Sequence, residues 1–404
     1  MTVIIHLLTT ACVVLLLTMG TGFFDLAHAA SKNLKQQKSD GLSFAWSKTF
    51  TTFSNYRAVV IAASDGGYLM TGSKGESVKD TGSSMWVMKT DRRGGMIWEK
   101  RFSPHKNSSN HGYAAIETAD GYLVTGTKNL SALHGGSDWN ELWVIKLANN
   151  GATIWEKAYG CQWSANTSAG EGHSILQTSD GGFIVAGFGS VGGVTTAWLV
   201  RLDRNGNRQW EKFLGAADDR GGVSPVSVAK ATDGHFYAAF TAPDEHAVLL
   251  KLDAAGTILW RRQLDQYQRS SLGSLSATSD GGFIFAGLGD GDGLLVKFDA
   301  SGSLGWHKTF GKNQQGKSAG LRAVTETTDN GFIAAGGISL GKALLWILRT
   351  DNRGMPLWDK EFSDRRQSTG YAVVQASDGG YVVCGRDDKG VAVWLLKLDA
   401  TGNR

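Results

Sequence analysis

The sequence predicts an all-β fold, a seven-bladed β-propeller of four-stranded antiparallel blades. Three observations predict it: an Asp-Gly turn motif recurs seven times, each repeat carries two hairpins, and the two chain ends supply complementary parts of one repeat. The 404 residues include 54 Gly but only 4 Pro, and 42% of them are hydrophobic. This composition is typical of short strands joined by tight turns around a large apolar core.

The first hairpin of each repeat turns at an Asp, as in Ser179-Asp180-Gly181-Gly182-Phe183. Asp followed by Gly between two apolar runs is a strong hairpin signal, because both residues tolerate positive φ. The seven turn residues, 47 to 60 positions apart, are Asp65, Asp120, Asp180, Asp233, Asp280, Asp329 and Asp378. We interpret them as turn formers rather than catalysts, because all seven hold the same place in the repeat.

A second hairpin follows in every repeat. Its first strand is apolar and usually begins with Trp, as in Trp198-Leu199-Val200-Arg201, and its second strand carries another Trp, such as Trp210. Four strands in a repeat of about 50 residues are typical of a propeller blade. Twelve of the 14 Trp residues occupy these two positions, and we expect them to pack between neighbouring blades.

The chain ends complete each other. The last repeat stops at Arg404, where its fourth strand should begin, while Phe44–Phe50 matches the fourth strand of an earlier repeat, Leu304–Phe310. The N-terminal strand is therefore predicted to complete the seventh blade, which removes the open edges that a ring would otherwise keep. The predicted propeller domain spans residues 41–404.

The N-terminus predicts export. Val3–Phe24 is mostly apolar, and Ala27-His28-Ala29 follows with the small-x-small pattern of a cleavage site. We expect a signal peptide over 1–29, a polar linker over 30–40, and a secreted or periplasmic protein with no membrane span after cleavage. The alternative is an uncleaved anchor, because this apolar stretch is long enough to cross a bilayer. The two cysteines beyond it, Cys161 and Cys384, form no disulfide framework, and Cys384 is expected in the core.

Alternating strand directions predict two unlike faces. The turns within the hairpins define one, the turn face, and the connections between hairpins and between repeats define the other, the loop face. The longest expected connections on the loop face are Ser73–Ser84, Ser103–Gly112, Lys128–Glu141, Gly160–Gly172 and Phe188–Thr196, all in the first three blades. Variable loops on a rigid scaffold commonly carry recognition.

Two tryptophans, Trp139 and Trp163, lie in these loops and outside the repeat, with His134 and Asp138 close in sequence. Aromatic and acidic side chains on adjacent loops can hold a sugar or a peptide. The alternative is that each Trp packs its own loop against the blade.

A second candidate site is the central channel. The residue seven positions before each turn Asp gives one equivalent position on the innermost strand of every blade, and these residues are Ala58, Tyr113, His173, Val226, Gly273, Arg322 and Tyr371. Tyr113, His173, Arg322 and Tyr371 would form a polar, aromatic collar at the channel mouth, suited to an anionic or sugar ligand. The alternative is that these side chains fill space between blades.

No motif predicts a cofactor, a metal or a catalytic residue. Asp290-Gly291-Asp292-Gly293 resembles the start of a calcium loop but lacks the remaining acidic ligands, so a solvated loop is the better interpretation. The net charge of +4 and the absence of a Lys/Arg stripe argue against a nucleic-acid partner. We expect a monomer whose ligand is a glycan or a protein.

Thr178–Lys212 resembles the repeats of exported bacterial propeller proteins, a group that mostly lacks a known activity. Lys251–Trp260 is also similar to the tryptophan-docking motif of PQQ-like propellers. The resemblance to quinoprotein dehydrogenases implies eight blades, adjacent cysteines and a calcium site, and this chain has seven repeats and no adjacent cysteines. A PQQ-like quinoprotein is thus the least favoured interpretation.

The sequence therefore favours an exported binding or scaffold propeller that recognises its ligand on the loop face of blades 1 to 3. The alternative from another class is a carbohydrate-active hydrolase or lyase with its site at the channel mouth near His173 and Arg322. Paired carboxylates in the channel would favour hydrolysis.

Overall fold

A computed structural model of the chain describes residues 45–404, apart from 54–57, 76–81, 105–107, 132–138, 161, 165–166, 169, 192–193, 215–223, 312–317, 340–342, 364–368, 388 and 390, and without the side chains of 162–164, 167–168, 191 and 224–225. The predicted signal peptide over 1–29 and the linker over 30–40 lie outside the described residues, as does Cys161. Among the described residues, no helix has the length and apolar character needed to span a membrane.

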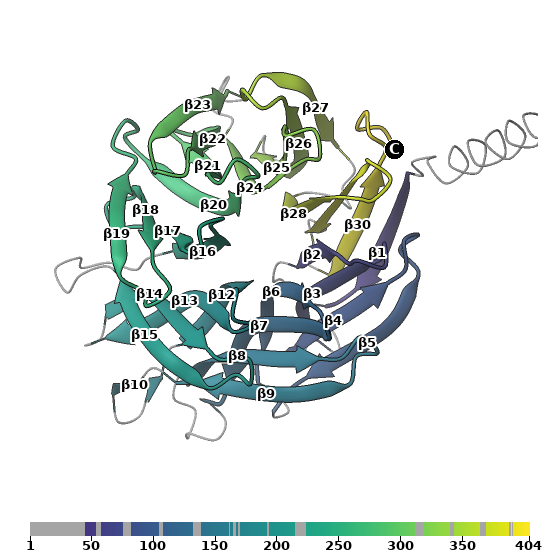
Figure 1. The fold of residues 1–404 in the computed structure, drawn as a ribbon. Coiled ribbons are helices and arrows are strands. Elements are labelled where there is room, and N and C mark those ends of the chain that lie inside the picture. The colour runs from purple at the N-terminus through teal and green to yellow at the C-terminus, as the bar shows by residue number, and fades with distance from the viewer. Residues whose placement is uncertain are drawn as a thin grey trace, which may run out of the picture. The chain divides into compact units, whose positions relative to one another are not determined.

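Seven four-stranded antiparallel sheets surround a central axis (Figure 1), so the predicted seven-bladed propeller is confirmed. Blades 1 and 2 are formed by β2 (Val59–Ala62), β3 (Tyr68–Lys74), β4 (Ser84–Thr90), β5 (Met96–Phe102), β6 (His111–Thr118), β7 (Gly121–Asn129), β8 (Asn140–Leu147) and β9 (Thr153–Tyr159). Blades 3 and 4 are formed by β12 (Gly170–Gln177), β13 (Phe183–Val191), β14 (Val194–Leu202), β15 (Arg208–Leu214), β16 (Ser224–Lys230), β17 (Phe236–Thr241), β18 (Ala247–Leu252) and β19 (Ile258–Gln263).

Blades 5 and 6 are formed by β20 (Ser270–Ala277), β21 (Phe283–Gly289), β22 (Asp292–Phe298), β23 (Leu304–Phe310), β24 (Ser318–Glu326), β25 (Phe332–Ser339), β26 (Ala343–Thr350) and β27 (Pro356–Phe362). Blade 7 joins β28 (Thr369–Gln375), β29 (Tyr381–Arg386) and β30 (Ala392–Leu398) to β1 (Trp46–Thr51). A small hairpin of β10 (Gln162–Ser164) and β11 (Thr167–Ser168) precedes blade 3.

The predicted closure is confirmed. β1 pairs antiparallel with β30 from Trp46 opposite Lys397 to Thr51 opposite Ala392, and the two strands lie side by side in Figure 1. The first strand of the propeller thus forms the outer strand of the last blade. The ring is held shut by main-chain hydrogen bonds and by the side chains on both strands.

The apolar core is divided into seven clusters, and each cluster is shared by two neighbouring blades. One cluster, for example, joins Leu199 of blade 3 to Phe240 of blade 4, and another joins Val382 of blade 7 to Met70 of blade 1. The other five follow the same pattern around the ring. Because each sheet buries its faces only against its neighbours, no blade has a core of its own.

The outer tryptophans dock on glycines of the next blade. Each of these glycines has a φ between +74° and +80°, and a Cβ there would come within 2.5–2.9 Å of a neighbouring side chain, the ring in nearly every case. The pairs are Trp46–Gly94, Trp98–Gly151, Trp155–Gly206, Trp210–Gly256, Trp260–Gly302, Trp306–Gly354 and Trp358–Gly402. Trp98 also donates its indole N–H to the carbonyl of Asn149 at 3.0 Å. The repeat tryptophans are therefore packing residues, as predicted.

A buried cation on the third strand of every blade pairs with the turn Asp of the same blade. The seven nitrogen–oxygen distances are 2.5–2.8 Å, and the pairs are Lys89–Asp65, Lys146–Asp120, Arg201–Asp180, Lys251–Asp233, Lys297–Asp280, Arg349–Asp329 and Lys397–Asp378. The repeat pattern predicts the Asp residues as turn formers, but these partners were not predicted. Each pair fastens a hairpin turn to the middle of its own sheet.

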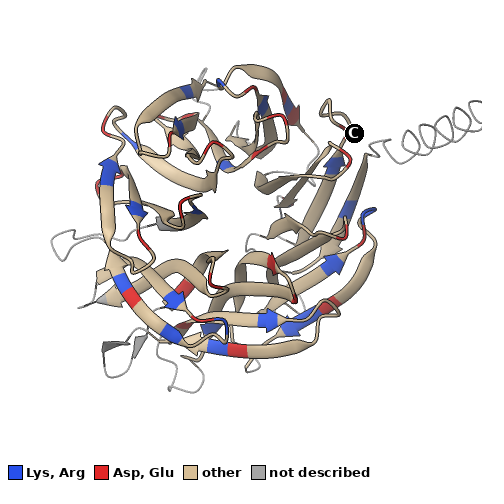
Figure 2. Cartoon of the chain, in the orientation of Figure 1, with Lys and Arg blue, Asp and Glu red and all other residues tan. Residues whose placement is uncertain are grey.

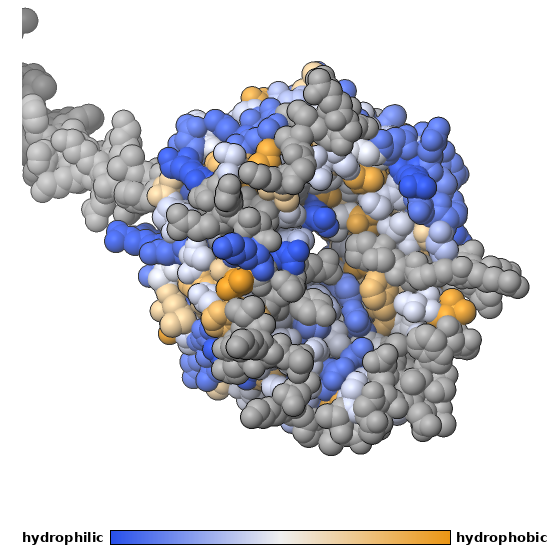
Figure 3. Space-filling model, turned by 180° about the vertical axis from the view of Figure 1, so that it is seen from behind, coloured by the Kyte–Doolittle hydropathy of each residue, from blue (hydrophilic) through white to orange (hydrophobic). Residues whose placement is uncertain are grey.

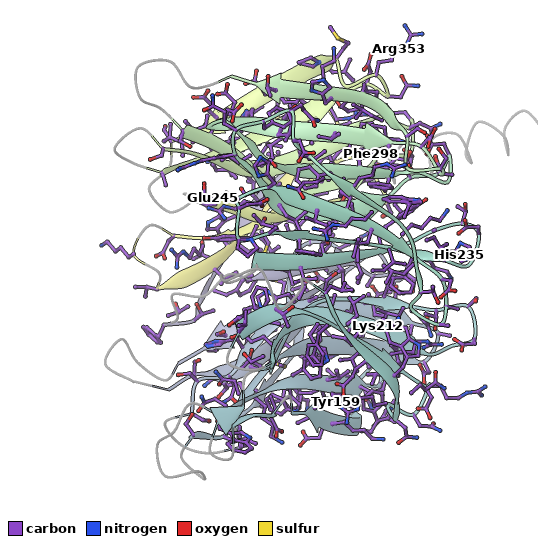
Figure 4. All side chains as sticks on the ribbon, turned by 90° about the vertical axis from the view of Figure 1, so that its left-hand side faces the viewer. Tyr159, Lys212, His235, Glu245, Phe298 and Arg353 are labelled. Carbon is purple, nitrogen blue, oxygen red and sulfur yellow. The ribbon has the colours of Figure 1, made fainter. Side chains whose placement is uncertain are left out.

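The two faces differ as predicted (Figure 4). Glu245, in the connection from β17 to β18, lies at one side of the propeller, and the turn residues His235 and Arg353 lie at the other. Both signs of charge are spread around the ring (Figure 2).

Two expectations for the loops are wrong. Phe188–Thr196 is no long loop, because β13 runs to Val191 and β14 begins at Val194. Long connections also extend beyond blades 1 to 3, since β23 ends at Phe310 and β24 begins only at Ser318. Residues 188–191 and 194–196 continue the ladder where a loop was expected.

Candidate functional site

The innermost strand of most blades carries a β-bulge, and the bulged residue is the one predicted to face the channel. The ladders of blades 2, 3, 5, 6 and 7 each skip one residue of the inner strand, and those residues are Tyr113, His173, Gly273, Arg322 and Tyr371. A bulge takes a residue out of the alternating pattern and redirects its side chain. The ring position is therefore set apart from the pairing that holds the sheet together.

Two of the seven predicted ring positions differ. In blade 4 the ladder skips the residue between Ser224 and Val226, so the bulge lies one residue before the predicted position, although Val226 still lines the channel. In blade 1, Ala58 precedes β2 and is fully buried in the cluster between blades 7 and 1. The uniform count of seven residues misses the shift in blade 4.

The second strand supplies the signal that marks each bulge. A glycine stands opposite it, and a Cβ there would lie only 1.6–2.0 Å from a carbonyl oxygen of the inner strand; these glycines are Gly126, Gly187, Gly287, Gly336 and Gly385. Glycine inside a strand often indicates a bulge or a close backbone approach. These glycines are thus a signal in the sequence from which the bulges could have been predicted.

The bulged residues converge on one cavity along the axis, with a volume of about 1130 Å³. Tyr113, His173, Arg322 and Tyr371 all line it, so the structure brings the four predicted collar residues together. Arg386, which the sequence analysis did not single out, lines it as well. Figure 3 looks onto the loop face, where a hollow lies at the centre with hydrophilic residues around it.

One sector of the cavity, on blades 2 and 3, is aromatic. The rings of Tyr113 and His173 are stacked, with centroids 4.4 Å apart and an angle of 21° between the planes. Phe188 lies 4.6 Å from His173, and Glu171 Oε2 lies 2.8 Å from His173 Nε2. The carboxylate thus fixes the orientation of an imidazole at the cavity wall.

Behind this sector lies a second histidine. His111 is buried, its Nδ1 lies 2.7 Å from Ser73 Oγ, and its ring centroid is 5.9 Å from that of Tyr113. Burial lowers the pKa of His111 to about 4, although the Glu171 carboxylate acts in the opposite direction. His111 is therefore neutral at pH 7 and supports the wall without adding charge.

The opposite sector, on blades 6 and 7, is cationic. Arg322 is exposed on the bulge of β24, and its guanidinium carbon lies 5.5 Å from the centroid of the Tyr371 ring. Arg386 enters the same wall from the end of β29, where it stands opposite Thr369 in the ladder. Two arginines and a tyrosine on neighbouring blades thus line the channel.

Most of the hydroxyl groups along the channel wall hold neighbouring blades together. Ser174, Ser227 and Ser274 each accept a backbone N–H from the inner strand of the next blade, at 3.1, 3.2 and 3.0 Å. Thr325 donates to the carbonyl of Val373 in blade 7 at 2.9 Å. These hydroxyl groups therefore have structural partners in the neighbouring blades.

The loop candidates do not form a comparable site among the described residues. Trp139 is half-buried, donates its indole N–H to Glu141 Oε1 at 3.2 Å, and donates its backbone N–H to Ser131 Oγ at 3.0 Å. These contacts lie within its own loop and support the packing interpretation. His134 and Asp138 lie outside the described residues, and for Trp163 only the backbone, in β10, is described.

No carboxylate belongs to the described residues that line the channel cavity. Within the same part of the chain, no group of three or more His, Cys, Asp and Glu side chains has the arrangement of a metal site. Asp290 and Gly291 form a tight turn between β21 and β22, with φ angles of 50° and 93°. The pair of carboxylates that glycoside hydrolysis requires is thus missing from the described cavity wall.

No protein-family model matches the chain, and no curated protein matches its sequence. Among solved structures, puromycin hydrolase is similar with a TM-score of 0.54 and 15% identity, over 86% of this chain and 52% of that one. A mutant of that enzyme complexed with PGG gives 0.55 and 16% over the same shares. Sqt1 from Chaetomium thermophilum gives 0.48 and 13%, over 84% and 83% of the two chains.

The chain therefore spans about half the length of puromycin hydrolase. At these identities the likeness shows the fold alone. The class of protein defined by the fold is the seven-bladed β-propeller, with an aromatic and cationic cavity on its axis.

Proposed function

We propose that this protein is an exported binding propeller that holds its ligand in the central channel, open to the loop face. One observation supports this most: four blades use a bulge to place an aromatic or charged side chain in the channel. Similar cavities on a rigid scaffold with a few converging polar groups are typical binding sites. Export follows from the predicted signal peptide.

Binding is favoured over hydrolysis because the described wall offers stacking surfaces and cations but no carboxylate pair. Recognition by the loops of blades 1 to 3 is the weaker alternative, because Trp139 is held within its own loop. The proposal moves the ligand from those loops to the channel mouth, where blades 2, 3, 6 and 7 contribute.

The test is binding of the purified full chain to an array of oligosaccharides and peptides, compared with His173→Ala, Tyr371→Ala and Trp139→Ala variants. Arg353→Ala is the matched control, because this exposed residue lies on the turn face. We expect the two channel variants to lose the array signal and the other two to keep it. Loss in Trp139→Ala alone would move the site to the loops, and conversion of a bound probe to product would show an enzyme.

Export is tested separately by mass spectrometry of the protein recovered from the host in which it is expressed. We expect a mature chain that begins at Ala30. A chain that keeps residues 1–29 in the membrane fraction would contradict export by cleavage.

A further inference from the structure

We infer that the ligand is an organic oxyanion, a carboxylated or phosphorylated saccharide, whose negative group binds at Arg322 and Arg386. This inference rests on the proposed function, because it names the chemistry of the ligand for the same cavity. Its basis is the uneven distribution of charge and aromatic surface around the channel.

The charge of the described wall is positive. Arg322 and Arg386 line the cavity, and no Asp or Glu is found among its described lining residues. An arginine stays protonated at any physiological pH, so this sector keeps its charge. Elsewhere in the fold the cation of each blade has a turn carboxylate 2.5–2.8 Å away, whereas Arg322 has no carboxylate partner in the part of the chain that is described.

The position of Arg322 suits an oxyanion. Its guanidinium carbon lies 5.5 Å from the centroid of the Tyr371 ring, in a cation–π contact that helps to position the group. The N–H groups of a guanidinium lie in its plane, at the edge, where they match the two oxygens of a carboxylate or phosphate. The bulge at this residue holds the side chain in the channel, away from the strand pairing.

The rest of the cavity has room for a ligand larger than an inorganic anion. A volume of about 1130 Å³ exceeds the roughly 300–1000 Å³ of common small-ligand pockets. Val59 and Ile61 supply apolar wall between the cationic sector and the stacked Tyr113 and His173. A sugar ring offers apolar C–H faces to such surfaces and an acidic group to the arginines, which a bare inorganic ion does not.

The competing polar groups are mostly occupied. The hydroxyls of Ser174, Ser227 and Ser274 accept bonds from the next blade, and Thr241 Oγ1 accepts the N–H of Leu272 at 2.9 Å. A neutral ligand would therefore find few hydroxyl partners on the wall. The cationic sector offers the strongest polar interactions in the cavity.

The experiment is isothermal titration of the full chain with trigalacturonate and with glucose 6-phosphate, each against a neutral sugar of matched size, maltotriose or glucose. The variants are Arg322→Gln and Arg386→Gln, with Arg353→Gln on the turn face as the charge-matched control. Because Arg322 is exposed, Arg322→Gln should have the same unfolding temperature as the wild type. A thermal unfolding measurement checks this before the titrations.

We expect one of the two anionic probes to bind and its neutral counterpart to bind at least about 10-fold more weakly, the size of effect expected for a charge-assisted hydrogen bond. Arg322→Gln should weaken binding of the anionic probe by a similar factor, and Arg353→Gln should leave its affinity unchanged. The probe that binds identifies the source of the charge.

A neutral sugar that binds as well as its acidic counterpart, with no loss in Arg322→Gln, would overturn the inference and leave the proposed channel site intact. A thermal-shift series in inorganic phosphate adds a readout that needs no sugar. Phosphate should stabilise the wild type more than either arginine variant, and equal stabilisation would contradict an anion site. Array signals that survive in both His173→Ala and Tyr371→Ala would instead refute the channel proposal itself.

Discussion

The contacts that repeat in every blade and the channel wall follow opposite rules. The same Trp–Gly and cation–Asp pairs recur in all seven blades. At the channel, one equivalent bulge position holds Tyr113, His173, Gly273, Arg322 or Tyr371. The repeated residues thus hold the ring together, while the residues that differ between blades give the channel wall its chemical character.

The largest effect on stability is expected at the glycine opposite a bulge, where a repeated residue makes room for a channel residue. In Gly187→Ala the new Cβ would lie 1.6 Å from the carbonyl oxygen of Glu171, so blade 3 has to lose its bulge or separate its strands. We expect a loss of about 3 kcal/mol or more in urea unfolding. Gly181→Ala is the control, because its φ is +82° but no atom lies within 4 Å, and about 1 kcal/mol is expected. Equal losses would show that the bulge is not what requires glycine.

A slightly smaller effect is expected between blades. Trp98→Ala removes the ring that covers Gly151 and the hydrogen bond to Asn149, and it should cost about 3 kcal/mol. Trp139→Ala, outside the repeat, should cost less than about 1 kcal/mol. Urea unfolding of both variants measures the difference, and a reversed order would contradict the division between repeated and divergent positions.

The channel side predicts a pH dependence. Because burial lowers the pKa of His111 to about 4, from 6.5 in the unfolded chain, the unfolded state binds the extra proton between these values. Stability should therefore fall as the pH is lowered from about 6.5 to about 4. Thermal unfolding of His111→Gln over this range should show a shallower fall than the wild type, and parallel curves would rule out His111 as the cause.

The repeated cation–Asp pairs predict a smaller effect at lower pH. A hydrogen bond from Thr178, together with Arg201 and the Gly182 N–H, lowers the pKa of Asp180 from 3.8 to about 2. A lowered carboxyl pKa stabilises the fold above about pH 4, and this contribution is lost as the pH falls toward 2. Asp180→Asn should reduce the pH dependence in that window only. Because Asp180 is largely exposed, the change at pH 7 should be small.

Much of this architecture was predictable because the same residues recur at the same positions in each repeat. The turn glycines, the two tryptophan positions and the match of Phe44–Phe50 to Leu304–Phe310 predict the blade count and the closure between β1 and β30. The collar was predictable for Tyr113, His173, Arg322 and Tyr371 by counting from a turn. The count was off by one residue in blade 4, because the bulge there lies before Val226.

The sequence by itself determined the ring, because a periodic hydrophobic pattern and the turn residues act locally and identically in every repeat. Only the tertiary structure decided which further side chains join the collar and which polar groups of the wall are already paired. Arg386 joins Arg322 from another blade, and the serines of the wall are taken up by neighbouring strands. Such contacts join residues about 50 or more positions apart, and they depend on how the blades close around the axis, which no local pattern records.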